Sequence, residues 1–104
     1  MEIAEVKRIL LENRIRTSAC LVNPSICREG ALCLRKEPNG NWTVTLNERG
    51  EYVMNDSFPS EDAACRYFLK VVLSDPTYRE DFRQSDLDTF MEEKEEILRK
   101  YNLV

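Results

Sequence analysis

The fold is decided by one continuous stretch: Trp42-Thr43-Val44-Thr45-Leu46, Asn47-Glu48-Arg49-Gly50, Glu51-Tyr52-Val53-Met54-Asn55-Asp56-Ser57-Phe58, and Pro59-Ser60-Glu61-Asp62-Ala63-Ala64-Cys65-Arg66-Tyr67. Its first segment alternates apolar and hydroxyl side chains, which is typical of a half-buried strand. Gly50 is free to adopt a positive φ and predicts a turn before a second strand. Ser60 is a good N-cap, and the two acids after it suit the positive end of a helix dipole. The stretch therefore predicts strand, turn, strand and helix.

The residues before this stretch predict one more helix and the rest of a small sheet. Residues 2–13 place four apolar side chains on one face and predict an amphipathic helix. Residues 31–37 alternate and predict a strand, and residues 18–22 are compatible with a shorter one. Between the strands of the first hairpin, Asn39-Gly40 is typical of a type I′ turn. A bulge or early strand end is indicated at Asn55-Asp56.

The residues after the central helix predict two further helical segments. Asp75-Pro76 indicates a helix start, with proline at the first helical position. Ser85-Asp86-Leu87-Asp88 resembles a capping box, and the helix after it is expected to run to about Lys100. The predicted fold class is α+β, in one domain spanning 1–104. A small antiparallel β-meander of three or four strands packs against an N-terminal helix and two to three C-terminal helices.

Composition places the chain among soluble globular proteins. Of its 104 residues, 42% are hydrophobic and 33% are charged. No apolar run approaches the roughly 20 residues needed to span a bilayer, so no membrane partner is expected. Glu2 and Glu5 stand where a secretion signal requires basic residues. We therefore expect a cytoplasmic protein.

The cysteines and the missing histidine bear on chemistry. The spacings of Cys20, Cys27, Cys33 and Cys65 match no C-x-x-C pattern, so reduced and mostly buried thiols are expected, with a disulfide framework as the alternative. Cys27 lies in a predicted loop and is expected to be the most exposed thiol. Absence of histidine removes the commonest general base and zinc ligand. This absence makes an enzyme less expected without excluding one, and we expect no catalytic residues, no cofactor and no metal.

The net charge of −4 is unevenly distributed. Residues 1–36 carry a balance of +3, residues 37–74 of −3 and residues 75–104 of −4. Nucleic-acid binding requires a basic face, so no nucleic-acid partner is expected. An acidic surface suits a basic protein partner, because complementary fields accelerate association. The alternative is an acidic surface that serves only solubility.

Two groups of side chains remain open to a functional or a structural interpretation. Five carboxylates near the strand ends and the helix start would suit a hydrolase or a hard-cation site if they converged, and would otherwise serve turns and caps: Glu48, Glu51, Asp56, Glu61 and Asp62. Trp42 is expected in the core rather than at an interface, whereas Tyr52 is left open.

The central stretch also carries a resemblance. Trp42-Thr43-Val44, Glu48-Arg49-Gly50 and the segment from Phe58 to Tyr67 resemble the small immunity proteins of bacterial polymorphic toxin systems, including contact-dependent inhibition systems. The pattern is a Trp-x-Val strand, a Glu-Arg-Gly turn and Phe-x-Ser-Glu-x-x-Ala-Cys-x-Tyr. It covers about a third of the chain, and residues 1–30 and 75–104 carry no matching motif.

The resemblance implies an inhibitor that is not an enzyme. Such a protein binds the C-terminal domain of a cognate toxin, for example a basic nuclease, in the cytoplasm and blocks its active site or an adjacent surface. The partner-binding candidates are Glu48, Arg49, Glu51, Asp56, Glu92, Glu93 and Glu96. Arg49 has an equally weighted alternative role, in which it stabilises the turn through a salt bridge. The other functions considered are an adaptor module and, less favoured, a carboxylate-dependent hydrolase.

Overall fold

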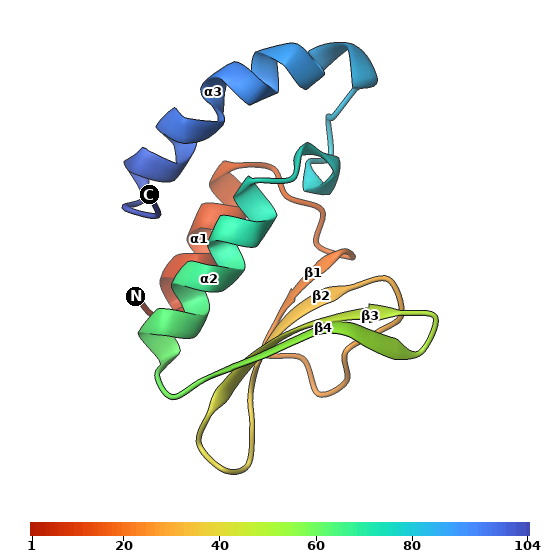
Figure 1. Ribbon diagram of the computed structural model, residues 1–104, viewed down its shortest axis with the longest axis vertical. Helices are drawn as coiled ribbons and strands as arrows, with labels where there is room; N and C mark the ends of the chain where they lie inside the picture. The colour runs from red at the N-terminus through yellow and green to blue at the C-terminus, as the bar shows by residue number, and fades with distance from the viewer.

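The computed structural model describes residues 1–104 and confirms the predicted α+β class (Figure 1). Three α-helices, two short 3-10 helices and one four-stranded sheet make up the fold. In chain order they are α1 (Ile3–Glu12), β1 (Cys20–Val22), β2 (Leu32–Lys36), β3 (Trp42–Glu48), β4 (Glu51–Phe58), α2 (Glu61–Leu73), η1 (Pro76–Tyr78), η2 (Gln84–Asp86) and α3 (Leu87–Lys100).

The sheet has the strand order β1-β2-β3-β4. β2, β3 and β4 form the predicted antiparallel meander. β1 runs parallel to β2, with Cys20 opposite Leu32, so the sheet is mixed rather than wholly antiparallel. A parallel pair requires a connection that crosses back along the sheet, and residues 23–31 provide it.

The two hairpin turns differ from the sequence prediction. In the β2–β3 loop only Gly40 has a positive φ, of 89°, and its N–H donates to the carbonyl of Glu37 at 3.0 Å. Pro38 fixes the φ that the first central position of an ordinary turn requires, so the predicted type I′ turn is wrong here. The two positive φ values occur instead at Arg49 (54°) and Gly50 (85°), between the paired residues Glu48 and Glu51. The type I′ geometry therefore belongs to the β3–β4 hairpin.

The elements form three layers. α1 and α2 cover one face of the sheet, and α3 lies on the side of these helices away from the sheet (Figure 1). The core between sheet and helices includes the fully buried side chains of Phe68, Leu34 and Val44. Trp42 is 6% exposed and belongs to the same core, as the sequence predicts. The Ser60 hydroxyl accepts from the N–H of Ala63 at 3.1 Å, which confirms the N-cap of α2.

The connection between β1 and β2 covers part of the other face of the sheet (Figure 1). The Asn47 side-chain amide donates to the carbonyl of Cys27 at 2.9 Å, and the N–H of Gly30 donates to the carbonyl of Asn47 at 2.7 Å. These contacts bury Cys27 against Cys33, with which it forms a disulfide. The expectation of an exposed, reduced Cys27 is therefore wrong.

The C-terminal helical region is more irregular than predicted. The segment after Asp75 is the 3-10 helix η1, in which the Asp75 carboxylate accepts from the N–H of Thr77 at 3.0 Å. Ser85 lies inside η2, and α3 begins at Leu87 without a side-chain cap, so the predicted capping box is wrong. α3 ends at Lys100, as expected. None of the helices combines the length and apolar character needed to cross a bilayer.

Candidate protein-binding surface

β4 is a long and exposed edge strand. It pairs only with β3, and none of its eight residues is buried. The opposite edge of the sheet is formed by β1, which has only three residues. Short edge strands give little backbone for another chain to pair with, whereas a long exposed one is a ready template. The sheet therefore has one edge suited to contact with another protein.

A β-bulge interrupts β4 close to the hairpin turn. Leu46 pairs with Met54 and Asn47 pairs with Tyr52, which leaves Val53 as the extra residue. The predicted bulge or early strand end at Asn55-Asp56 is therefore wrong, because the extra residue is Val53 and the strand continues to Phe58. A bulge re-aims neighbouring side chains. Here Tyr52 is 50% exposed and Val53 is 55% exposed, so two consecutive large side chains expose apolar surface at the edge.

Charged residues lie around Val53. An open hollow beside the hairpin is lined by Glu29, Gly30, Glu48, Arg49, Glu51 and Val53. The structure therefore brings together three of the predicted site residues and adds Glu29. An apolar centre with a charged rim is the usual composition of a protein-binding surface. We define Glu29, Glu48, Arg49, Glu51, Tyr52 and Val53 as the hairpin surface.

Arg49 lies in the left-handed region of the backbone and forms none of the chain's ion pairs. The turn is instead held by the Asn47 side-chain carbonyl, which accepts from the N–H of Gly50 at 3.0 Å. The alternative in which Arg49 stabilises the turn through a salt bridge is therefore wrong. A residue with a side chain costs roughly 1–2 kcal/mol in this region, which glycine avoids.

Asp56 is separate from the turn acids. It pairs with Val44, whose side chain is in the core, so it points toward the helix layer. There its carboxylate accepts from the hydroxyl of Tyr67 at 2.9 Å. This hydrogen bond is the main reason that the pKa of Tyr67 is raised. Asp56 thus joins β4 to α2.

The other two carboxylates of the predicted cluster lie where α1 meets α2. Glu61 accepts from the N–H of Ile3 at 2.9 Å. Asp62 accepts from the amino group of Met1 and from the Nε of Arg66, and these hydrogen bonds lower its pKa. Both acids are therefore used in joining the helices and do not converge with the acids at the hairpin. No group of three or more cysteines and carboxylates is arranged to hold a metal ion.

The predicted acids of α3 lie far from the hairpin. Glu92, Glu93 and Glu96 are exposed on a helix at the opposite side of the molecule from the β3–β4 turn (Figure 1). Only Glu93 lines a cavity, which is the cleft between α3 and residues 76–86. The two predicted groups of partner-binding residues therefore do not form one continuous surface.

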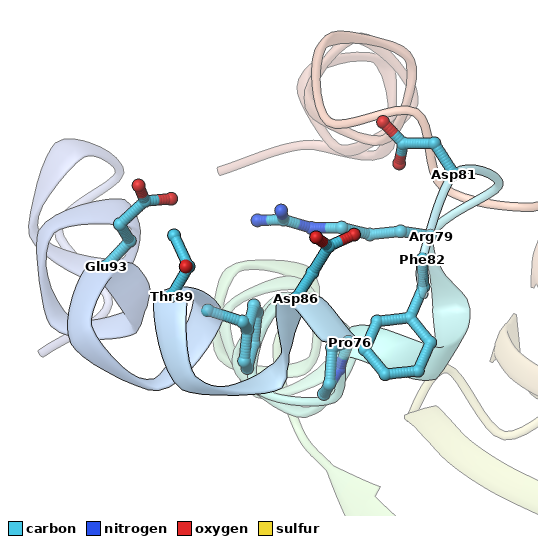
Figure 2. A pocket seen from close by; sticks show the side chains of 8 residues that line it. Pro76, Arg79, Asp81, Phe82, Asp86, Thr89 and Glu93 are labelled. Carbon is cyan, nitrogen blue, oxygen red and sulfur yellow. The ribbon is translucent and has the colours of Figure 1, made fainter. Parts of the chain in front are cut away.

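The cleft between α3 and residues 76–86 is small, and the Arg79 side chain is part of its lining. Its volume of about 190 Å³ is below the roughly 300 Å³ at which small-molecule sites begin. Figure 2 shows the Arg79 side chain extending across it. The guanidinium carbon of Arg79 lies 5.1 Å from the centre of the Phe90 ring, which is a cation–π distance. The hairpin surface is therefore the stronger candidate.

Glu29 is the residue that sequence reasoning missed. It lies in the connection before β2, some twenty residues from the hairpin turn in the chain. It approaches the turn because its neighbour Gly30 is hydrogen-bonded to Asn47. No local pattern signals such a contact.

Comparison of the chain with protein-family models, with curated proteins and with solved structures finds no match.

Proposed function

We propose that this chain is an immunity-type inhibitor that binds a toxin domain through the hairpin surface and thereby neutralises it. The observation that carries the proposal is the exposure of Tyr52 and Val53 on an edge strand, next to the charged side chains that line the hollow together with Val53. Tyrosine is enriched among the residues that dominate binding energies at interfaces. The resemblance of the central stretch to immunity proteins supplies the class of partner.

The charge of the hairpin surface indicates the chemistry of that partner. Glu29, Glu48 and Glu51 line the hollow with Arg49 as its only basic residue. The chain as a whole carries a net charge of −4. Such a surface attracts a basic protein and accelerates the encounter. A basic toxin domain, such as a nuclease that acts in the cytoplasm, fits this requirement. In this proposal the chain has no catalytic role and binds neither nucleic acid nor membrane.

Arg49 supports the proposal through its backbone conformation. The β3–β4 turn would be more stable with asparagine or glycine at this position, because both adopt a positive φ more readily. The Arg49 side chain forms no ion pair within the chain that would compensate for the cost of its positive φ. Strained residues that persist without a structural reason are concentrated at functional sites. We infer that the Arg49 side chain contacts the partner.

The proposal is tested by co-expression with the C-terminal domain of the polypeptide encoded immediately upstream. The two proteins are purified together, and their affinity is measured at two salt concentrations. We expect a nanomolar complex that weakens as salt rises, because screening reduces the attraction between the acidic and basic surfaces. The complex should also abolish the toxicity of the upstream domain. Absence of both a complex and protection would contradict neutralisation and favour an adaptor function.

Charge reversal then locates the contact surface. The double variant Glu48→Lys/Glu51→Lys should lower the affinity at least tenfold, mainly through slower association. The matched control is Glu92→Lys/Glu96→Lys, which makes the same change of charge on α3. We expect this control to bind within about threefold of the unchanged chain. If the α3 variant loses affinity and the hairpin variant does not, the hairpin is not the contact surface.

A further inference from the structure

We propose that the open edge of β4 accepts an extended basic segment of the partner as a fifth strand of the sheet. This inference rests on the proposed function only for the identity of the partner, because the geometry of the edge is a property of this chain. Addition of a strand to an exposed sheet edge gives affinity through main-chain hydrogen bonds. The question is which backbone groups of β4 are free to form them.

The hydrogen bonds of β3 answer this question. At one end of β3, the N–H of Glu37 donates to the carbonyl of Asn41 at 2.8 Å. At the other end, the carbonyl of Asn47 accepts from Gly30 at 2.7 Å, and its N–H donates to Ala31 at 3.1 Å. Both asparagines thus direct backbone groups toward the β2 side. Since successive residues of a strand point their backbone groups to opposite sides, the even-numbered residues of β3 face β4.

The register transfers this alternation to β4. The β4 residues opposite the even-numbered residues of β3 are Met54, Asp56 and Phe58. Their backbone N–H and C=O groups therefore point toward β3. Asn55 and Ser57 lie between them and direct their N–H and C=O groups to the open side. Neither residue takes part in the hydrogen bonds outside the regular elements, so no loop or helix of the chain satisfies these groups. Four backbone groups are thus available for another strand.

The side chains of β4 offer little protection against pairing. Natural edge strands are commonly guarded by lysine or proline, and β4 contains neither. Its bulge lies at Val53, near the hairpin turn, and leaves residues 54–58 regular. The side chains of Asn55 and Ser57 are small and polar, opposite Thr45 and Thr43, so they present no obstacle to a neighbouring strand.

The charge along the edge selects a basic segment over a second copy of this chain. β4 carries two acids, Glu51 and Asp56, and no basic residue. A second copy paired through β4 would bring two sets of these acids to one seam, where like charges repel. A partner segment with lysine or arginine at alternate positions would instead place positive charges beside Glu51 and Asp56.

The experiment titrates the ¹⁵N-labelled full chain with a nine-residue peptide in which lysine and valine alternate. We expect shifted amide resonances and at least tenfold slower hydrogen exchange at Asn55 and Ser57. A peptide that is N-methylated at every residue cannot donate from either of its edges and should leave these amides unchanged. Perturbation only at other residues, or none at millimolar peptide, would overturn the inference. Concentration-dependent pairing of the chain with itself through β4 would also overturn it.

A pair of variants separates the backbone group from the side chain. Ser57→Pro removes the N–H that faces the open edge, and proline is tolerated at such positions of edge strands. Ser57→Ala removes only the hydroxyl. We expect at least tenfold weaker peptide binding in the proline variant and unchanged binding in the alanine variant. Equal binding by both variants would contradict strand addition. If the proline variant does not fold, the N-methylated peptide still tests the same hydrogen bonds.

The same variants distinguish this inference from the proposed function. If the upstream domain binds Ser57→Pro as tightly as the unchanged chain, strand addition is wrong and neutralisation stands. If the upstream domain does not bind the unchanged chain at all, the proposed function is wrong. The peptide titration then still decides whether β4 accepts a basic strand.

Discussion

Replacement of Arg49 by asparagine should make the folded chain more stable. Arg49 has a φ of 54° and Gly50 a φ of 85°, which is the pattern of a type I′ turn. Asn-Gly is the favoured pair for this turn, because asparagine tolerates the left-handed region better than arginine does. No ion pair of the Arg49 side chain is lost in the exchange.

The expected size of the effect follows from the backbone. The left-handed conformation costs an ordinary residue roughly 1–2 kcal/mol, of which asparagine retains a part. We therefore expect a gain of about 0.5–1 kcal/mol in the free energy of unfolding. For a chain of this size, that gain corresponds to a rise of roughly 2–8 °C in Tm. The matched control is Gly50→Ala, in which the added Cβ meets no atom within 4 Å. Its expected loss of about 1–2 kcal/mol is therefore due to the backbone alone.

Urea unfolding followed by the fluorescence of Trp42 measures both variants. This tryptophan is the only one in the chain and is buried, so its emission reports exposure of the core. The slope of the free energy against urea should stay constant, which shows that the variants change stability and not compactness. A loss of 1 kcal/mol or more in Arg49→Asn would refute the reasoning, because the arginine side chain would then be stabilising the turn. Arg49→Asn should nevertheless bind the partner less tightly.

Three further predictions concern the core, the thiols and the contact between β4 and α2. Phe68→Ala should lower the free energy of unfolding, measured in urea titrations, by about 3–5 kcal/mol, because removal of the fully buried ring leaves a cavity. A loss below 1 kcal/mol would contradict the place of Phe68 in the core. Burial raises the pKa of Cys20 to about 12 and of Cys65 to about 11. A thiol reagent at pH 8 should therefore label neither cysteine in the native chain and both in urea. Rapid labelling of the native chain would contradict their burial. The hydrogen bond to Asp56 raises the pKa of Tyr67, so its stabilisation is complete below the unfolded pKa of about 10 and is lost as pH rises through the higher folded value. Tyr67→Phe should therefore lose less stability between pH 9 and 12 than the unchanged chain, and an equal loss would exclude this contact as the cause.

Local patterns predicted most of the fold. The strand that begins at Trp42 and the N-cap at Ser60 depend on residues close together in the sequence, and both appear in the structure. Residues 42–45 are all buried, however, because the helices cover one face of β3 and the β1–β2 connection covers the other, so β3 is not the half-buried strand that its alternation predicts. The type I′ turn occurs in the β3–β4 hairpin and not in the predicted β2–β3 hairpin, because two local signals compete in the β2–β3 loop. Asn39-Gly40 favours a type I′ turn, whereas Pro38 fixes its own φ at the negative value that the first central position of a type I turn requires. The sequence alone does not show which signal prevails.

Contacts between distant segments explain the errors at the candidate site. Glu48, Arg49 and Glu51 were predicted because they surround one turn, whereas Glu29 reaches the turn only through the path of the β1–β2 connection. The same path brings Cys27 to Cys33, in a pairing that the cysteine spacing did not indicate. The acids of α3 were grouped with the hairpin by charge alone, and charge carries no information on the relative position of two elements.

The most direct test of the central claim is an amide hydrogen-exchange footprint of the chain with the protein domain encoded immediately upstream, which we propose to be its toxin partner. Exchange is measured for the free chain and for the complex under identical conditions. The proposed contact predicts strong slowing across residues 48–58, with the largest effect at Asn55 and Ser57, and little change along α3. Slowing confined to α3 and the cleft below it, with β4 unchanged, would contradict binding through the hairpin surface.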